Sequence, residues 1–425
     1  MAQEGRPLSL KVNFSWTLAG NCVQAVCRYA LLVLLVYSCG LAAGGRYALA
    51  VALCTPIWSL AGFGLRGALV TDTRQQHAFA DYLAARLLAM AGALVVVAGA
   101  ILLADYAMQT AAMVLLVAAA KTIEGVSDIL HARLQRSERM DRVAMALILR
   151  GLGSVAMMLI AVGLGGGPLL LVASLPAAMA LTLLLWDLPC IAHASDANGT
   201  QLWRTAIDWN ALRSLTQVAA PIAAGTFLVT LIPQLPKYVI GGTLGEESVA
   251  IYTLIAYWIT LGMMVVTALG NTVTPRLAKY YAAGDLNQFR QLVGRLVLMM
   301  ASAGAAGVLV VALFGPRLLA LIDPRAAELP RLALALSVFA AFLYVTGPLG
   351  RALSAMRRFW TQTAIRSIGV VVALILLPPA VSTRGLTGAA EAMSVSMAVV
   401  AALLGAALWR EVGLGKRHVL SPCEP

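Results

Sequence analysis

Charged residues are scarce in this sequence. Only 12% of its 425 residues are Asp, Glu, Lys or Arg, and 60% are hydrophobic, whereas a soluble domain carries about a quarter charged residues. This scarcity excludes a soluble globular protein. Apolar stretches follow one another along the chain, and a membrane-spanning helix needs roughly 20 such residues to cross about 30 Å of hydrocarbon. The composition therefore predicts an all-α membrane protein.

The sequence also lacks the patterns that metal sites and soluble enzymes require. Its six cysteines form no C-x-x-C pair, and its four histidines, His77, His131, His193 and His418, do not have the spacing of metal ligands. The P-loop, G-x-S-x-G and H-E-x-x-H motifs are absent as well. We expect a protein that is not an enzyme and that binds no metal and no cofactor.

The net charge of +12 comes from 31 basic and 19 acidic residues. The basic residues lie between the apolar stretches and are not gathered into one patch or arm, so nucleic acid is not expected as a partner. Membrane topology and attraction to anionic membrane lipids explain these charges instead.

About twelve segments are long and apolar enough to span a membrane as helices. They cover residues 14–37, 47–65, 84–104, 107–131, 143–163, 168–187, 218–240, 248–272, 293–314, 327–349, 365–383 and 386–408. The longest polar connection divides these segments six and six. We predict an N-terminal six-helix lobe over 1–187, a cytoplasmic linker over 188–217, and a C-terminal six-helix lobe with a cytoplasmic tail over 218–425.

Lys and Arg are distributed unevenly between alternate connections. One side of the predicted spans holds 22 of the 31 basic residues, and the opposite side holds only five: Arg46, Arg317, Arg325, Arg331 and Arg384. Positive charge marks the cytoplasmic side of a membrane protein. Both termini are therefore predicted to be cytoplasmic.

Polar side chains recur on one helical face of the first predicted span. Thr17, Asn21, Gln24 and Arg28 follow at spacings of four, three and four residues. Ionisable residues inside a membrane are costly and usually face a cavity, and a guanidinium can bind two phosphate oxygens at once. Arg28 is therefore a candidate anion-binding residue. The alternative is a structural arginine that reaches the interface or pairs with a carboxylate.

The fourth predicted span has the densest polar face in the chain. Lys121, Glu124, Asp128, His131 and Gln135 share this face at i, i+3, i+7, i+10 and i+14. Membrane carboxylates often serve as relays, so Glu124 and Asp128 are candidates for ion coupling. A structural ion pair between Lys121 and Glu124 is the alternative for those two residues.

The second half of the chain contributes fewer candidates. Pro233 and Pro236 predict a kinked seventh span, and Lys237 directly follows them. Tyr257 and Asn271 lie on one face of the eighth span, where hydrogen bonding between helices competes evenly with sugar binding.

Six stretches of the sequence together resemble a known family by their order and spacing. They are NFSWTLAGN (13–21), GRYALAVALCTPIW (45–58), LRGALVTDTRQQHAFADYLAARL (65–87), KTIEGVSDILHARLQRSERMDR (121–142), QLPKYVIGGTLGEESVAIYTLIAY (234–257) and PRLAKYYAAGDLNQF (275–289). They resemble the polysaccharide biosynthesis flippases of the multidrug/oligosaccharidyl-lipid/polysaccharide exporter superfamily, which includes O-antigen and exopolysaccharide translocases. The resemblance covers about two-thirds of the chain.

This resemblance implies two six-helix lobes around a central cavity in a multi-pass protein of the bacterial inner membrane. The substrate that it implies is an undecaprenyl-diphosphate-linked oligosaccharide, carried from the cytoplasmic to the periplasmic leaflet by alternating access. A polysaccharide polymerase and an export machinery are the implied partners. A cation-coupled multidrug exporter of the same superfamily is the alternative, and a membrane-embedded polymerase or ligase is a more distant one.

A diphosphate group needs buried cations, and four lie within predicted spans: Arg28, Lys121, Arg150 and Lys237. We expect Arg28 and Lys121 to bind the diphosphate. The polar residues of the first and eighth spans are expected to contact sugar: Asn21, Gln24, Tyr257 and Asn271.

Overall fold

The computed structural model describes residues 10–71, 78–103, 106–137, 139–193, 220, 223–320 and 329–418, almost all of which are helical. The chain divides into two compact units, residues 1–231 and 232–425. Within the described residues, nine helices are long and apolar enough to cross a membrane. The all-α membrane fold predicted from composition is therefore confirmed.

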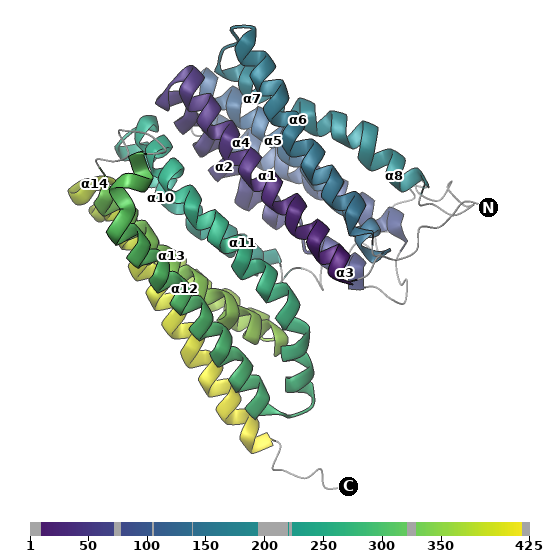
Figure 1. Cartoon of the computed structure of the whole chain (residues 1–425), viewed down its shortest axis with the longest axis vertical. Coiled ribbons are helices and arrows are strands. Elements are labelled where there is room, and N and C mark those ends of the chain that lie inside the picture. Colours follow the sequence, from purple (N-terminus) through teal and green to yellow (C-terminus); the bar gives the residue numbers. More distant parts are fainter. Residues whose placement is uncertain are drawn as a thin grey trace. The chain divides into compact units, whose positions relative to one another are not determined.

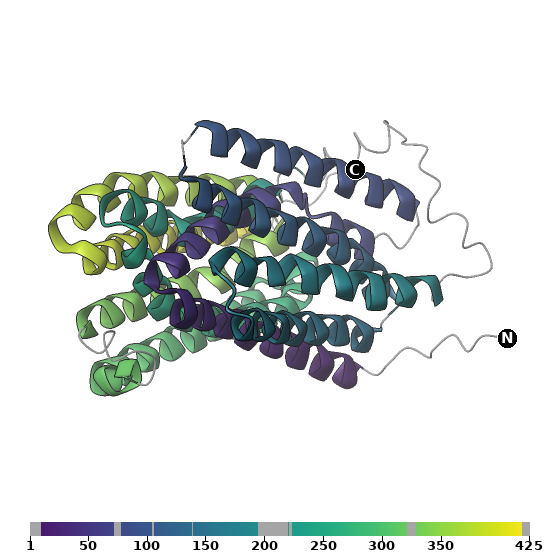
Figure 2. The ribbon, with the colours of Figure 1, turned by 90° about the horizontal axis from the view of Figure 1, so that it is seen from above.

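The helices of the first unit lie side by side as a bundle (Figure 1, purple to teal; Figure 2). They are α1 (Leu10–Cys39), α2 (Leu41–Ala61), α3 (Leu65–Thr71), α4 (Phe79–Leu103), α5 (Met108–Arg136), α6 (Met140–Gly163), α7 (Pro168–Thr182), the π-helical turn η1 (Leu183–Asp187) and α8 (Leu188–His193). Helix α5 contacts α2, α3, α4, α6 and α7, and α1 packs along α6. The polar face predicted on the fourth span therefore belongs to the central helix of this unit.

An apolar core packs the bundle around the N-terminal half of α5, before its charged residues begin at Lys121. Trp58 of α2, Met90 of α4, Met113 and Val117 of α5, and Leu171 of α7 are all buried in one cluster. Between membrane-spanning helices such a cluster stabilises the bundle by close van der Waals packing, because lipid tails are as apolar as these side chains. Helix α5 therefore contacts its neighbours through apolar side chains in its N-terminal half and through charged side chains further along.

The second unit consists of long helices (Figure 1, green to yellow). They are the 3-10 turn η3 (Ile232–Gln234), α10 (Leu235–Thr243), α11 (Glu246–Ala282), α12 (Leu286–Ala320), α13 (Pro330–Ala355) and α14 (Phe359–His418). Helix α13 contacts α11, α12 and α14. Helix α14 is a pair of helices that meet at Gly385, where φ is 60° and ψ is −139°.

The observed helices correspond to the twelve predicted segments, although only nine of the described helices are both long and apolar enough to be counted as spans by composition. The 54-residue apolar stretch Phe359–Val412 changes direction at Gly385 and holds the last two segments. Helix α5 is not among the nine apolar helices because it carries charged residues. Residues 223–231 are helical and continue through η3 into α10, which matches the kink predicted at Pro233 and Pro236. The linker predicted over 188–217 lies mostly outside the described residues, and the domain boundary stays a prediction.

Gly385 occupies a backbone conformation that strongly disfavours any side chain. We expect Gly385→Ala to lower stability by about 1–3 kcal/mol through backbone strain alone, because an added Cβ has no heavy atom within 4 Å. The measurement is the apparent unfolding temperature of the detergent-solubilised protein. Gly405→Ala is the matched control, since Gly405 is also free of close atoms but lies inside a regular helix. An equal loss in both variants would contradict the strain at Gly385.

Candidate functional site

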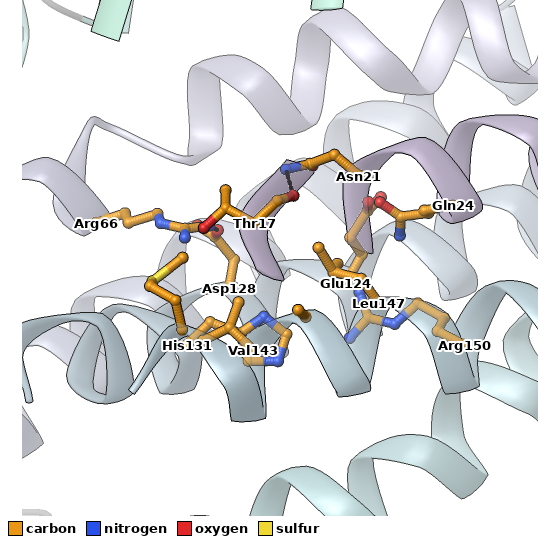
Figure 3. A pocket seen from close by; sticks show the side chains of 12 residues that line it. Thr17, Asn21, Gln24, Arg66, Glu124, Asp128, His131, Val143, Leu147 and Arg150 are labelled. Carbon is orange, nitrogen blue, oxygen red and sulfur yellow. Dashed lines mark hydrogen bonds and ion pairs between the residues drawn. The ribbon is translucent and has the colours of Figure 1, made fainter. Parts of the chain in front are cut away.

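A cavity of about 170 Å³ lies within the first unit, between α1, α5 and α6. Figure 3 shows side chains from these helices and from α3 pointing toward one another around it. Its polar lining consists of Thr17, Asn21, Gln24, Arg66, Glu124, Asp128, His131 and Arg150, and α6 adds the apolar Met140, Val143, Ala144 and Leu147. The polar faces predicted on the first and fourth spans therefore meet in one cavity.

The charged face of α5 extends far along the helix. From Lys121 to Gln135 it rises by about 21 Å, at 1.5 Å per residue, which is roughly two-thirds of the hydrocarbon thickness of a bilayer. Isolated charges at such depths are very costly. Each carboxylate on or beside this face is accordingly found between two basic side chains.

Glu124 is the carboxylate that lies furthest along α5 from its C-terminal end at Arg136. Its Oε1 accepts a hydrogen bond from Nη2 of Arg28 on α1, and its Oε2 accepts one of 2.9 Å from Nζ of Lys121. The side chain keeps 25% of its surface exposed. The ion pair of Lys121 with Glu124 is thus present, and Arg28 of the polar face on α1 joins it.

Asp128 lies one helical turn further along α5. Its Oδ1 accepts a hydrogen bond of 2.6 Å from Nη1 of Arg66 on α3, and its Oδ2 accepts one of 2.9 Å from Nη2 of Arg86 on α4. Arg66 also donates to Oε1 of Gln135, with Nη2 at 2.9 Å. Asp128 therefore connects three helices through charge-assisted hydrogen bonds, which are stronger than neutral ones.

Asp187 is the most buried carboxylate of the group, with 1% of its side chain exposed. Its Oδ1 lies 3.1 Å from Nε2 of His131, and its Oδ2 lies 3.5 Å from Nη2 of Arg150 on α6. Asp187 ends the π-helical turn Leu183–Asp187. A π turn inserts one residue into the helical register, and such turns are frequent at functional sites.

The network carries an excess of positive charge. Among its described members, five are Arg or Lys and three are carboxylates, so the formal charge is +2 when His131 is counted as neutral. Two buried donors at the cavity, Nε2 of Gln24 and Nε of Arg150, have no hydrogen-bond acceptor among the described residues. An unsatisfied buried donor costs about 1–3 kcal/mol. Excess charge and unpaired donors together suit an anionic ligand that is rich in acceptors.

The structure brings some of the predicted binding residues together and places others elsewhere. Asn21, Gln24 and Arg150 line the cavity, and Arg28 and Lys121 adjoin it through Glu124. Their roles in binding, and the ion-coupling roles of Glu124 and Asp128, stay predictions.

The predicted residues of the second half lie in other helices. Lys237 is in α10, where its Nζ donates a hydrogen bond of 2.9 Å to Oε1 of Gln234. Tyr257 is a half-buried residue of α11. The side chain of Asn271 lies outside the described part of the chain.

Four members of the network were not among the predicted site residues: Arg66, Arg86, His131 and Asp187. The sequence places His131 on the polar face of the fourth span but gives it no role. In the sequence, Arg66 and Arg86 are counted among the basic residues that mark the cytoplasmic ends of spans. In the structure, both side chains donate hydrogen bonds to Asp128. Asp187 is a single acid at the end of an apolar stretch. This position was the signal by which the sequence could have identified Asp187 as a site residue, because a lone carboxylate at the end of a span needs a partner.

Residues 10–281, which include the whole cavity, match the family described as "Polysaccharide biosynthesis protein". The chain belongs to this polysaccharide biosynthesis protein family. The resemblance seen in the sequence is thereby confirmed. Residues 221–379 also match the family described as "MatE".

A bacterial relative and several solved structures extend the comparison to most of the chain. The capsular polysaccharide biosynthesis protein CapF of Staphylococcus aureus is 20% identical over 317 residues, which are 73% of this chain and 76% of CapF. A multidrug resistance MATE family transporter of the MOP superfamily, in an inward-facing conformation, has a TM-score of 0.75 at 13% identity and covers 97% of both chains.

Two further structures have the same fold. The Vibrio cholerae MATE transporter VcmN has a TM-score of 0.69 at 13% identity, over 95% of this chain and 96% of VcmN. A MOP superfamily transporter from Pyrococcus furiosus, whose reversed pocket polarity suggests a different function, has a TM-score of 0.69 at 14% identity, over 95% of both chains. These similarities show a MATE-like fold over nearly the whole chain. The protein is therefore a multi-pass membrane protein of a polysaccharide biosynthesis family.

Asp187 compensates buried positive charge, so its removal is predicted to destabilise the first unit. Asp187→Ala leaves Arg150 buried without its carboxylate, and loss of one partner of a buried ion pair costs about 3–5 kcal/mol. The apparent unfolding temperature in detergent measures this loss. Glu391→Ala is the control, because Glu391 pairs with Arg384 at an exposed position and such pairs contribute about 0–1 kcal/mol. An unchanged unfolding temperature for Asp187→Ala would show that the Asp187 pair is not required for stability.

Proposed function

We propose that this protein is a flippase that moves an undecaprenyl-diphosphate-linked oligosaccharide from the cytoplasmic to the periplasmic leaflet of the bacterial inner membrane by alternating access. The product serves the export of an exopolysaccharide or an O-antigen-type polymer, with a polysaccharide polymerase and the export machinery as partners. One observation carries this proposal: the cavity of the first unit is surrounded by more cations than carboxylates.

The charge of the network agrees with the charge of the proposed head group. A diphosphate diester carries two negative charges, and the network has a formal excess of two positive charges. Arg28 and Lys121 are the proposed diphosphate ligands, since both already bind an anion, the carboxylate of Glu124. Arginine forms two parallel hydrogen bonds to phosphate oxygens, and lysine adds a compact point charge.

The size of the cavity also favours a compact charged group. Pockets for drug-sized ligands have volumes of about 300–1,000 Å³, whereas this cavity has about 170 Å³. The cavity is proposed to take the charged head group, with Asn21 and Gln24 of its lining supplying amide groups to the adjoining sugar. In the second lobe, Lys237, Tyr257 and Asn271 remain proposed substrate contacts. The two lobes, 1–187 and 218–425, are proposed to move relative to each other during transport.

A cation-coupled multidrug exporter is the second candidate, because residues 221–379 match the MatE family and solved multidrug transporters share the fold. Many drugs exported in this way are organic cations, which a net positive cavity repels. The charge of the network therefore favours the flippase.

Arg28→Ala and Lys121→Ala are each predicted to abolish or strongly reduce polymer export. Each substitution removes a proposed diphosphate ligand, and charge-assisted hydrogen bonds of this kind contribute about 1.5–3 kcal/mol. Polymer on the cell surface is measured in a strain in which the variant replaces the native protein, at matched protein level.

The control for these variants is Arg384→Ala, which removes an arginine from an exposed pair in the second unit and should leave export unchanged. If Arg28→Ala and Lys121→Ala both retained normal export, we would abandon the assignment of the diphosphate site. If deletion of the gene left polymer intact but raised drug susceptibility, the multidrug exporter would be the correct function.

The proposed direction of transport requires a defined orientation. We expect a fluorescent protein fused after residue 425 to fluoresce, because both termini are proposed to be cytoplasmic. A short epitope inserted at Gly165, in the turn between α6 and α7, should be accessible from the periplasm. Antibody labelling of intact spheroplasts measures whether the inserted epitope is accessible. An epitope that is reached only after permeabilisation contradicts this orientation.

A further inference from the structure

Glu124 and Asp128 bind their cations in the same way. Each carboxylate uses one oxygen for one cation and the second oxygen for another, so that it bridges two basic side chains. A phosphate group bridges cations through separate oxygens in the same manner. The two carboxylates therefore occupy positions that phosphate oxygens of a ligand could take.

Both carboxylates are also accessible from the cavity. Glu124 and Asp128 line it, with 25% and 31% of their side chains exposed. Asp187, which also lies between two basic groups, has 1% exposed and is not part of the lining. A ligand in the cavity could thus compete with Glu124 and Asp128 for their cations, but Asp187 is enclosed by the helices.

We propose that Glu124 and Asp128 are resident counter-ions, which neutralise the cations of the empty transporter and are displaced by the diphosphate of the substrate. This inference rests on the proposed flippase function and assigns a role to the acidic residues of the same site. Cations in a low-dielectric cavity need an anion at every stage of transport. A carboxylate with one charge can yield to a diphosphate with two, and it can return when the substrate leaves.

The spacing of the two carboxylates provides two successive positions. Glu124 and Asp128 are four residues apart on α5, which separates them by about 6 Å along the helix axis. Arg66 and Arg86 form the position nearer the predicted cytoplasmic end of α5, and Arg28 and Lys121 form the deeper one. The head group would exchange with Asp128 first and with Glu124 second.

A counter-ion limits affinity so that the substrate can be released. Transport requires binding that is favourable enough for entry yet weak enough for exit. Replacing the carboxylate by an amide of the same shape removes the competitor but retains the cations. The inference therefore predicts tighter binding combined with slower transport, whereas a structural role predicts weaker binding and an ion-coupling role predicts loss of gradient dependence at unchanged affinity.

The test uses the full chain, purified in nanodiscs, with inorganic diphosphate as the probe. Isothermal titration calorimetry is expected to show about tenfold tighter binding for Glu124→Gln and for Asp128→Asn than for the native protein. In proteoliposomes, the same variants are expected to flip a polyprenyl-diphosphate-linked sugar more slowly than the native protein. Glu391→Gln removes a negative charge from an exposed pair in the second unit and should change neither quantity.

The outcomes separate this inference from the proposed function. Native protein that binds diphosphate and flips the lipid-linked sugar, together with unchanged or weaker binding in both folded variants, overturns the counter-ion role alone. Tighter binding in the variants without any flipping by the native protein supports the counter-ion role and overturns the flippase. Absence of diphosphate binding in every form overturns the counter-ion role, and it overturns the flippase as well only when the native protein also fails to flip the lipid-linked sugar. The two variants act at separate positions, so a variant that fails to fold leaves the other as a complete test.

Discussion

A carboxylate among membrane helices needs a cation within hydrogen-bond distance, because an uncompensated charge in a low-dielectric medium costs several kcal/mol. The first unit meets this requirement three times, at Glu124, Asp128 and Asp187, and always with two basic partners. These contacts join α1, α3, α4, α6 and η1 to the central helix α5. Ion pairing therefore adds to the apolar packing of these helices, which forms one cluster around the N-terminal half of α5 and two smaller clusters beside the charged residues.

Ion pairs of this kind specify an arrangement more than they add stability. Their Coulombic attraction is largely offset by desolvation, but loss of one partner leaves a buried charge and is strongly destabilising. A shifted α1 or α4 would separate Arg28 from Glu124 or Arg86 from Asp128. The network thus selects one register of the helices around the cavity, and the same residues that define this register face the proposed substrate.

The sequence predicts the helices well because a span is a local property of length and hydrophobicity. It also predicts which residues share a face, since Thr17, Asn21 and Gln24, or Glu124 and Asp128, follow the helical period. It does not predict partners: Arg28 and Glu124 are 96 residues apart, and Arg66 and Asp128 are 62 apart.

Asp187 shows the same limit in a different way. The direction of its side chain depends on the π turn Leu183–Asp187. A regular α-helix drawn from the sequence would place this side chain on another face. In the sequence, Arg66 and Arg86 are explained by membrane topology alone, because the positive-inside rule applies to any basic residue near the end of a span. Only tertiary packing distinguishes a cation that faces water from one that enters a network.

The polarity of the cavity separates two functions that one fold can support. A transporter of organic cations gains affinity from unpaired carboxylates, whereas here both cavity-lining carboxylates already bridge pairs of cations. A cationic drug would have to displace two basic side chains from a carboxylate and then remain beside them, which like-charge repulsion opposes. An anionic head group displaces one carboxylate and retains both cations. The exchange that the structure permits is therefore anion for anion, and this favours a diphosphate-linked substrate on electrostatic grounds that do not depend on the family to which the chain belongs.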